Sequence, residues 1–342
     1  MGIRTLDLFC GGGGSSYGAR NAGAQIVCGV DACPIAVETY KTNFPDAKAI
    51  RFEMRGDSGP ELLGDIGKID LLLASPECTN HTCARGSRPR IEESRDTARY
   101  VLNFARELEP RWIVIENVIH MKSWDGYGPL LSELRALGYH PTPRVLDSSD
   151  FGVRQTRKRL FILCDRQANP FTIKTRPGRR PAAAGILDNK GTWQSRPLYS
   201  EGRAAATIER AERAMNELGM YTPFLIVYYG SDGPGGWQAL DRPLRTITTL
   251  DRFGLVTWDG REPMLRMLQP SELARAMGFQ ADYRLDHVRQ RRDRIRLLGN
   301  GVAPPVMEAI VQALTISRGD VIAFPPGRPL LPTVRPRLLS VA

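Results

Sequence analysis

The sequence predicts an α/β fold, with a mostly parallel, doubly wound sheet and a smaller second domain. Over the first 165 residues, short apolar segments alternate with amphipathic ones, which is the pattern of strands that alternate with helices. A glycine-rich turn at residues 11–14 follows the first apolar segment and precedes the first predicted helix. After about Arg166 the alternation stops and Gly, Pro, Arg and polar residues become frequent, which indicates an irregular second domain.

The predicted strands are short and apolar, and the predicted helices carry apolar residues at helical spacing. Strands are expected over residues 3–9, 25–30, 47–52, 69–74, 112–115 and 160–164. Helices are expected over residues 16–22, 34–43, 97–108, 129–137, 269–277 and 306–317, and Pro34 is in a first-turn position that suits proline. In such a sheet, ligands bind at the edge formed by the carboxyl ends of the strands.

The composition is that of a globular protein, with 342 residues of which 42% are hydrophobic and 25% charged. No segment has the roughly 18 consecutive apolar residues of a membrane span, and the first residues show no signal-peptide pattern. We therefore expect a cytoplasmic protein that is not attached to a membrane. The net charge of +10 favours a polyanionic partner, and basic residues gather at residues 174–180 and 289–296.

The six cysteines are scattered along the chain, and only two pairs, Cys28/Cys33 and Cys78/Cys83, are closely spaced. A structural zinc site needs four ligands, usually in close pairs, and cytosolic thiols are normally reduced. We therefore expect free thiols and no metal site.

Cys78 follows the apolar segment 69–74, so its thiol is expected at the carboxyl end of a strand. A thiol there is either an inert small hydrophobe or a nucleophile. Glu116 ends the strand that begins near residue 112, and Arg157 and Arg159 share one face just before another strand. Alone, Glu116 could cap a helix and the arginines could form a solvated edge. Together at one sheet edge, these groups favour a nucleophilic Cys78.

The glycine-rich turn and Asp31 indicate a nucleoside-bearing ligand. Glycines let the backbone come close to a ligand, and the following helix offers unpaired N–H groups. Asp31 ends the second predicted strand, where a carboxylate can accept hydrogen bonds from both hydroxyls of a ribose. This spacing alone does not distinguish a dinucleotide from S-adenosylmethionine.

Taken in order, these motifs resemble those of the DNA cytosine-5 methyltransferases, over nearly the whole chain. Residues 7–14 resemble the family's cofactor loop, and Asp31 with residues 36–40 is similar to its second motif. The other matching segments are Glu116-Asn117-Val118, residues 150–159, Arg242-Pro243, Thr246-Ile247-Thr248, Gly278-Phe279 and residues 299–302.

The resemblance implies a Rossmann-like, S-adenosylmethionine-dependent methyltransferase fold and assigns a role to each matching residue. The implied catalytic residues are Cys78, Glu116, Arg157 and Arg159, and the implied substrate contacts are Asn117, Thr82 and Gln155. The implied S-adenosylmethionine contacts are Phe9, Gly11, Gly13, Gly14, Asp31, Glu53, Met54, Pro76, Asn300 and Val302.

The sequence departs from the family at the nucleophile, where Pro76-Glu77-Cys78-Thr79 replaces the usual Pro-Pro-Cys-Gln. Thr82 keeps a hydroxyl where the family has serine. A carboxylate beside a thiol raises the pKa of the thiol, so either Glu77 points away or positive groups activate Cys78. For the family's third motif, the resemblance favours Glu53-Met54 over Asp57 for the adenine contact.

The resemblance implies methyl transfer to C5 of a flipped-out cytosine in double-stranded DNA, by a monomer with a restriction-modification or solitary role. An RNA (tRNA) cytosine-5 methyltransferase and a catalytically impaired DNA-binding relative are the alternatives. The predicted segments are a catalytic and cofactor-binding domain at 1–165, a target-recognition domain at 166–290, a return to the catalytic domain at 291–325 and a Pro/Arg-rich tail at 326–342. Lys174, Arg176, Arg179 and Arg180 are expected to contact phosphates or bases in the recognition domain.

Overall fold

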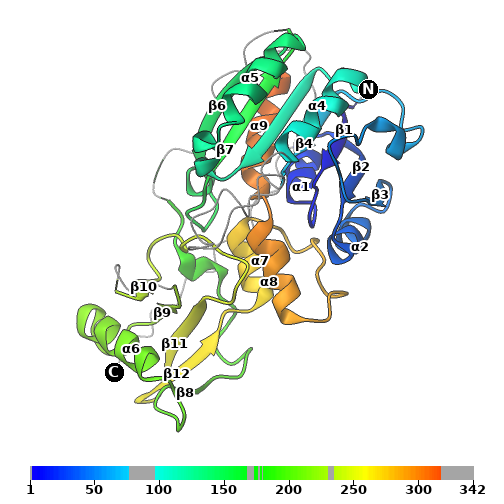
Figure 1. Cartoon of the computed structure of the whole chain (residues 1–342). Helices are drawn as coiled ribbons and strands as arrows, with labels where there is room; N and C mark the ends of the chain where they lie inside the picture. Colours follow the sequence, from blue (N-terminus) through cyan, green and yellow to red (C-terminus); the bar gives the residue numbers. More distant parts are fainter. Residues whose placement is uncertain are drawn as a thin grey trace.

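The structure is a computed structural model of the chain, and it describes residues 2–76, 97–167, 173–175, 178, 180–229 and 235–316. These residues form a seven-stranded sheet flanked by helices and a separate five-stranded sheet (Figure 1). Two helices, α7 (Pro270–Met277) and α8 (Arg291–Asn300), lie between the two sheets in this view. No helix in the described ranges is long and apolar enough to span a membrane.

The large sheet confirms the predicted doubly wound architecture. Its strand order is β3-β2-β1-β4-β5-β7-β6, and the first five of these strands are parallel, whereas β7 is antiparallel to both of its neighbours. The chain adds β2 and β3 on one side of β1 and then β4 on the other, so the order reverses between β1 and β4. The strands are β1 Arg4–Leu8, β2 Gln25–Asp31, β3 Lys48–Arg51, β4 Leu71–Ala74, β5 Trp112–Asn117, β6 His140–Asp147 and β7 Lys158–Asp165.

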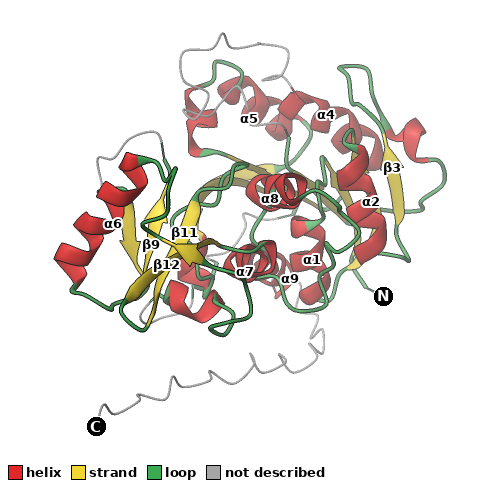
Figure 2. Ribbon diagram, turned by 90° about the horizontal axis from the view of Figure 1, so that it is seen from below, coloured by secondary structure: helices red, strands yellow, loops and turns green. Residues whose placement is uncertain are grey.

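Helices cover both faces of this sheet, which explains why its central strands are apolar throughout. In β4, Leu71 and Leu73 pack into one hydrophobic core, and Leu72 and Ala74 pack into the other. Figure 2 shows α1 and α9 below the sheet and α4 and α5 above it. The helices are α1 Gly14–Asn21, α2 Pro34–Asn43, α4 Thr97–Leu108, α5 Tyr127–Ala136 and α9 Pro304–Ile316.

The C-terminal helix α9 returns to the large sheet by packing closely on α1. A Cβ atom at Gly18 would lie 2.3 Å from the carbonyl oxygen of Pro304, so only glycine permits this approach. The predicted helix at 306–317 therefore begins two residues earlier than expected, with Pro304 as its first residue. Prolines suit the first turn of a helix, because the N–H groups there have no partner within the helix.

The edge strand β6 is absent from the sequence prediction. It contains Pro141 and Pro143, which cannot donate to a ladder and are tolerated only on edge strands. Its burial is irregular and Val145 is exposed, so the strand shows no clear alternation of apolar and polar residues.

The part of the chain after residue 166 contains more regular structure than the sequence analysis predicts. It holds an antiparallel sheet of order β10-β9-β11-β12-β8, covered by a 14-residue helix with its own small core. The loops dominate the composition and hide the helical spacing of Thr207, Ala211 and Ala214. These elements are β8 Arg196–Pro197, α6 Ala205–Leu218, β9 Phe224–Val227, β10 Trp237–Ala239, β11 Phe253–Asp259 and β12 Glu262–Met267.

Candidate active site

A cavity of about 610 Å³ opens at the carboxyl ends of the central parallel strands, where the strand order reverses. Cavities of this size hold small ligands and cofactors in other proteins. Most of the predicted site residues line it. They are Phe9, Gly11, Gly14, Asp31, Glu53, Met54, Pro76, Glu116, Arg157, Arg159, Asn300 and Val302.

The glycine-rich turn forms one wall of this cavity. Gly11 has a φ of +52° and Gly13 a φ of +86°, and Phe9 also adopts a left-handed conformation that is uncommon for an aromatic residue. A Cβ atom at Gly14 would lie 2.3 Å from the carbonyl oxygen of Val302, so α1 begins directly against the α8–α9 connection.

Gly13 does not line the cavity, although the resemblance places it in the cofactor site. A Cβ atom there would lie 2.4 Å from the ring of Phe44. This glycine therefore serves the packing of the loop against the residues that follow α2.

Asp31 is held at the end of β2 by the backbone around it. Its Oδ2 accepts a hydrogen bond from the Gly11 N–H and its Oδ1 accepts one from the Cys33 N–H, both at 2.8 Å. Burial raises the pKa of this carboxyl, and the backbone N–H groups oppose the rise. Each carboxylate oxygen can accept more than one hydrogen bond, so Asp31 can still accept hydrogen bonds from ligand hydroxyls in the cavity.

Residues of α8, together with two cysteines from the N-terminal part of the chain, complete the cavity, and sequence reasoning missed several of them. Arg296 lines it and donates to the Cys33 sulfur at 3.7 Å, and Cys10, Cys33 and Leu297 also line it. Arg296 and the predicted Asn300 lie four residues apart on α8, so they share one helix face. The sequence prediction identified a basic cluster there but no helix.

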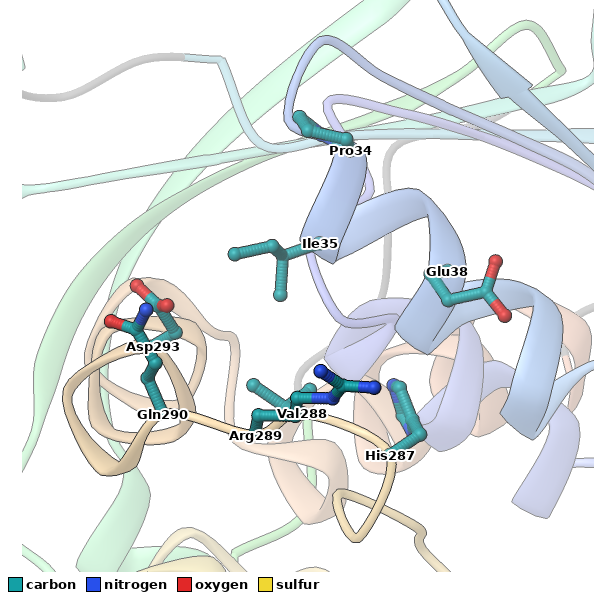
Figure 3. Close-up of a pocket in the computed structure, with 8 residues that line it drawn as sticks. All are labelled: Pro34, Ile35, Glu38, His287, Val288, Arg289, Gln290 and Asp293. Atoms are coloured by element: carbon teal, nitrogen blue, oxygen red, sulfur yellow. The ribbon is translucent and has the colours of Figure 1, made fainter.

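The segment after α7 braces the glycine-rich turn from outside. The Tyr283 hydroxyl donates to the Gly12 carbonyl oxygen at 2.8 Å, and Asn43 exchanges two hydrogen bonds with the Arg284 backbone. A second, smaller cavity of about 320 Å³ lies between α2 and residues 287–293 (Figure 3). None of the predicted site residues lines this second cavity, so the larger one is the candidate active site.

Glu116 and Arg159 form an ion pair at the carboxyl end of β5. The Glu116 Oε1 lies 3.3 Å from the Arg159 Nε, and the glutamate is buried. Burial raises the pKa of Glu116, while the guanidinium groups of Arg159 and Arg157 partly oppose the rise. A carboxyl group whose pKa is raised in this way can donate a proton or a hydrogen bond to a ligand.

Gln155 and Arg157 hold the loop that connects β10 and β11 of the five-stranded sheet. The Gln155 Oε1 accepts from the Ile247 N–H at 2.7 Å, and the Arg157 Nη1 donates to the Ile247 carbonyl at 3.0 Å. The Arg157 Nη2 donates to the Gly299 carbonyl at 2.8 Å. Gln155 is fully buried and does not line the cavity, so the structure does not place it where a substrate contact was expected.

Asn117 also lies outside the cavity lining, in contrast to its expected substrate contact. Its Nδ2 donates to the Pro76 carbonyl at 3.2 Å and its Oδ1 accepts from the Val118 N–H at 2.8 Å. Asn117 therefore joins the end of β5 to the turn after β4.

The predicted nucleophile segment follows Pro76 directly. Residues 77–96, which include Glu77, Cys78, Thr82 and Cys83, lie outside the described residues. Cys10, Cys28, Cys33 and Cys164 are free thiols, and the described ranges contain no cluster of metal-binding side chains.

The predicted recognition residues are only partly described. The Arg180 side chain is half exposed, and its Nε donates to Asp150 at 2.9 Å, while its Nη1 lies 3.7 Å from Asp147. Two carboxylates therefore offset its charge. Lys174 is exposed, and Arg176, Arg179 and the tail at 326–342 are outside the described residues.

Comparison with known proteins identifies one family. A sequence model described as C-5 cytosine-specific DNA methylase matches residues 3–315. The chain is 32% identical to the type II methyltransferase M.HgiDI of Herpetosiphon aurantiacus, over 71% of this chain and 80% of that protein. It is 29% identical to the mouse tRNA (cytosine(38)-C(5))-methyltransferase, over 52% of this chain and 43% of that protein.

Other relatives are matched over a smaller part of their length. The similarity to the type II methyltransferase M.AgeI of Thalassovita gelatinovora, at 33% identity, spans 47% of this chain and 39% of that protein. Among solved structures, the Dnmt2 methyltransferase of S. pombe has a TM-score of 0.67 at 20% identity, over 93% of this chain and all of that chain. At this identity the structural match establishes the fold alone.

Proposed function

The chain belongs to the C-5 cytosine-specific DNA methylase family, and on that premise we propose that it methylates C5 of a cytosine in double-stranded DNA. One observation supports this reaction above the others. Glu116 is buried against Arg159 in the same cavity that holds the glycine-rich turn and Asp31. A carboxyl group that can protonate a nucleobase and a site for the nucleoside part of a cofactor thus share one cavity.

The cavity fits S-adenosylmethionine, the methyl donor of this family. Asp31 would accept hydrogen bonds from the ribose, while Gly11 and Gly14 let the backbone come close to the ligand. Phe9 and Met54 offer apolar contacts, and Asn300 and Val302 line the same cavity. When bound, the cofactor supplies an electrophilic methyl group on its sulfonium sulfur.

The residues of the chain would activate the cytosine. The base leaves the stack at a cost of a few kcal/mol, and the Cys78 thiolate adds to C6 of the ring. Glu116, in its protonated form, donates to N3 and neutralises the charge that develops there, which makes C5 nucleophilic. Arg159 would bind O2 of the ring. Once C5 carries the methyl group that the cofactor would supply, a base would remove the C5 proton and the C6–sulfur bond would break, which restores the ring and frees Cys78.

Arg157 steadies the pocket in this proposal, which is the part that the resemblance implies for it. Both of its terminal nitrogens donate to backbone carbonyls, so it positions the Gly299 and Ile247 segments beside the cavity. Its positive charge also lowers the pKa of Glu116 against the effect of burial. We assign it as a positioning residue, with Arg159 as the arginine that contacts the base.

DNA is favoured over tRNA as the substrate by the family model, which is described as a C-5 cytosine-specific DNA methylase and matches residues 3–315. The similarity to M.HgiDI covers most of both chains, whereas the mouse tRNA enzyme matches about half of this chain. The net charge of +10 suits either nucleic acid. We further propose that the protein is a cytoplasmic monomer, in a restriction-modification or solitary role.

Methyl transfer from labelled S-adenosylmethionine to duplex DNA and to tRNA tests the proposal. We expect label in DNA, at C5 of cytosine after hydrolysis to nucleosides, and none with Glu116→Gln. Label in tRNA alone would replace DNA by RNA as the substrate. Normal cofactor binding without transfer to either nucleic acid would instead support a catalytically impaired DNA-binding relative.

A further inference from the structure

Asp7 is a buried carboxyl group next to the cofactor cavity, and the proposed mechanism does not use it. It lies on β1, opposite Gly29 on β2 and Leu73 on β4, at the point of the sheet where the strand order reverses. Its side chain is fully buried, whereas Cys10, three residues later, lines the cavity. After burial, the charge of Asp7 is the next cause that raises the pKa of the Cys10 thiol. The carboxyl group is therefore electrostatically coupled to the wall of the cavity.

A chain of hydroxyl groups holds one oxygen of this carboxyl group. The Asp7 Oδ2 accepts a hydrogen bond from the Ser16 hydroxyl at 2.7 Å, and the Ser16 oxygen lies 2.8 Å from the Tyr40 hydroxyl. Tyr40 is held against the sheet, because a Cβ atom at Gly29 would lie 2.3 Å from its ring. Burial raises the pKa of Tyr40, so Tyr40 keeps its proton and donates it toward Ser16. Two hydroxyl groups in series thus stabilise a negative charge on Asp7.

The other oxygen, Asp7 Oδ1, is buried and has no hydrogen-bond partner in the described ranges. Burial raises the pKa of Asp7 from 3.8 to about 7, and the hydroxyl and N–H groups of Ser16 oppose the rise. The opposite residue on β4, Leu73, is apolar. The titratable groups that interact with Asp7 include no cation, and they are Asp31, Cys10, Cys28 and Tyr40. A cation bound in the cavity would therefore stabilise the charged form of Asp7.

The charges that line the cavity do not favour a cationic ligand by themselves. The lining includes three arginines and three acids, which are Arg157, Arg159, Arg296, Asp31, Glu53 and Glu116. Because Glu116 is protonated in the proposed mechanism, three cations face two anions there. S-adenosylmethionine carries a positive sulfonium. After methyl transfer, the electron pair of the broken bond stays on sulfur, and S-adenosylhomocysteine is a neutral thioether. A further anion thus matters for the cofactor and not for its product.

We propose that the Asp7 carboxylate selects the cationic cofactor over its neutral product. Opposite charges attract more strongly in a protein interior than in water, and this attraction ends when sulfur loses its positive charge. The product is then held less tightly than the cofactor, which favours its replacement by a new cofactor molecule. Asp31 acts differently, because its proposed hydrogen bonds go to ribose hydroxyls that both ligands carry. This inference rests on the proposed fit of S-adenosylmethionine to the cavity.

Calorimetry with S-adenosylmethionine and S-adenosylhomocysteine tests this selection without any nucleic acid. The preference is the ratio of the two dissociation constants. At pH 8, Asp7→Asn should reduce the preference for the cofactor about tenfold, the order of magnitude for two unit charges that are not in contact inside a protein. The affinity for S-adenosylhomocysteine should stay nearly the same. At pH 5.5 the two proteins should show the same preference, because Asp7 is then protonated.

The wild-type protein offers a second measurement that needs no variant. Binding of a cation lowers the pKa of Asp7, so near pH 7 S-adenosylmethionine should release more protons than S-adenosylhomocysteine. Binding heats measured in buffers of different ionisation enthalpy give the number of protons released.

Asp165→Asn is the matched control. Asp165 is also buried, but it ends β7 opposite Trp112, the first residue of β5, and so lies at the edge of the sheet away from the cavity. This variant should keep the wild-type preference. An unchanged preference in Asp7→Asn at pH 8, or equal proton release by the two ligands, would overturn the inference. A wild-type protein that bound neither ligand would overturn the assignment of the cavity, and the inference with it. Normal selection between the ligands without methylation of DNA would contradict the proposed function alone.

Discussion

Arg157 offers the sharpest test of how the two parts of the chain are joined. It is 3% exposed, and its guanidinium donates to the carbonyls of Ile247 and Gly299 at 3.0 and 2.8 Å. A hydrogen bond from a charged group contributes about 1.5–3 kcal/mol, so Arg157→Ala removes about 3–6 kcal/mol of interaction. Because Arg157 lines the cavity, water can reach the freed carbonyls, and we expect a loss near 3 kcal/mol.

Urea unfolding monitored by circular dichroism measures this loss as a fall in the midpoint at constant m-value. Arg157→Lys keeps the charge, but one ammonium group cannot reproduce the two-pronged contact, so about half of the loss should remain. Arg144→Ala, at an exposed position on β6, is the control and should leave the midpoint unchanged. A loss below about 1 kcal/mol for Arg157→Ala, or full recovery with lysine, would refute the assignment of Arg157 as a structural clamp.

Three further predictions concern the cofactor cavity and the buried acid behind it. Gly14→Ala should weaken S-adenosylmethionine binding at least tenfold in calorimetry, because its Cβ would meet the Val302 carbonyl at 2.3 Å, whereas Gly128→Ala, with open space around it, should not. Asp31→Ala should cost about 1.5–3 kcal/mol of cofactor binding, and unchanged affinity would assign the ribose contact to another acid. Burial raises the pKa of Asp7 from 3.8 to about 7. As the pH rises between these values, the unfolded chain loses this proton before the folded protein does, so the free energy of unfolding of the wild-type protein should fall by up to about 4 kcal/mol, and Asp7→Asn should remove this fall. If the urea midpoint shifted equally between pH 5 and pH 8 in the wild-type protein and in Asp7→Asn, the prediction for Asp7 would be contradicted.

The parallel core of the fold was predictable because its strands are buried on both faces. The residues of β4 pack alternately into two cores, so the strand is an uninterrupted run of apolar residues that the sequence shows clearly. The helix α2 begins at Pro34 as predicted, because proline marks a first turn. In contrast, β6 contains two prolines and has no regular alternation, and α8 is so rich in arginine that its helical spacing is hidden.

The candidate site was predictable where side chains follow directly from the ends of strands. Asp31 and Glu116 line the cavity because parallel strands bring their carboxyl ends together. Tyr283 and Arg296 were missed because they reach the site only through packing of the chain's C-terminal part against α1 and α2. Gln155 occupies the position that the motif predicts, but its side-chain oxygen accepts a hydrogen bond from the Ile247 N–H. No local sequence pattern identifies this partner.

The central claim, covalent catalysis on cytosine by Cys78, is tested most directly with duplex DNA that carries 5-fluorocytosine at the target position. Fluorine at C5 blocks the final elimination, so the protein and the DNA should remain covalently joined in the presence of S-adenosylmethionine. Denaturing electrophoresis should show this adduct for the wild-type protein and for Cys83→Ala, and none for Cys78→Ala. An adduct that persists in Cys78→Ala but disappears in Cys83→Ala would contradict the account.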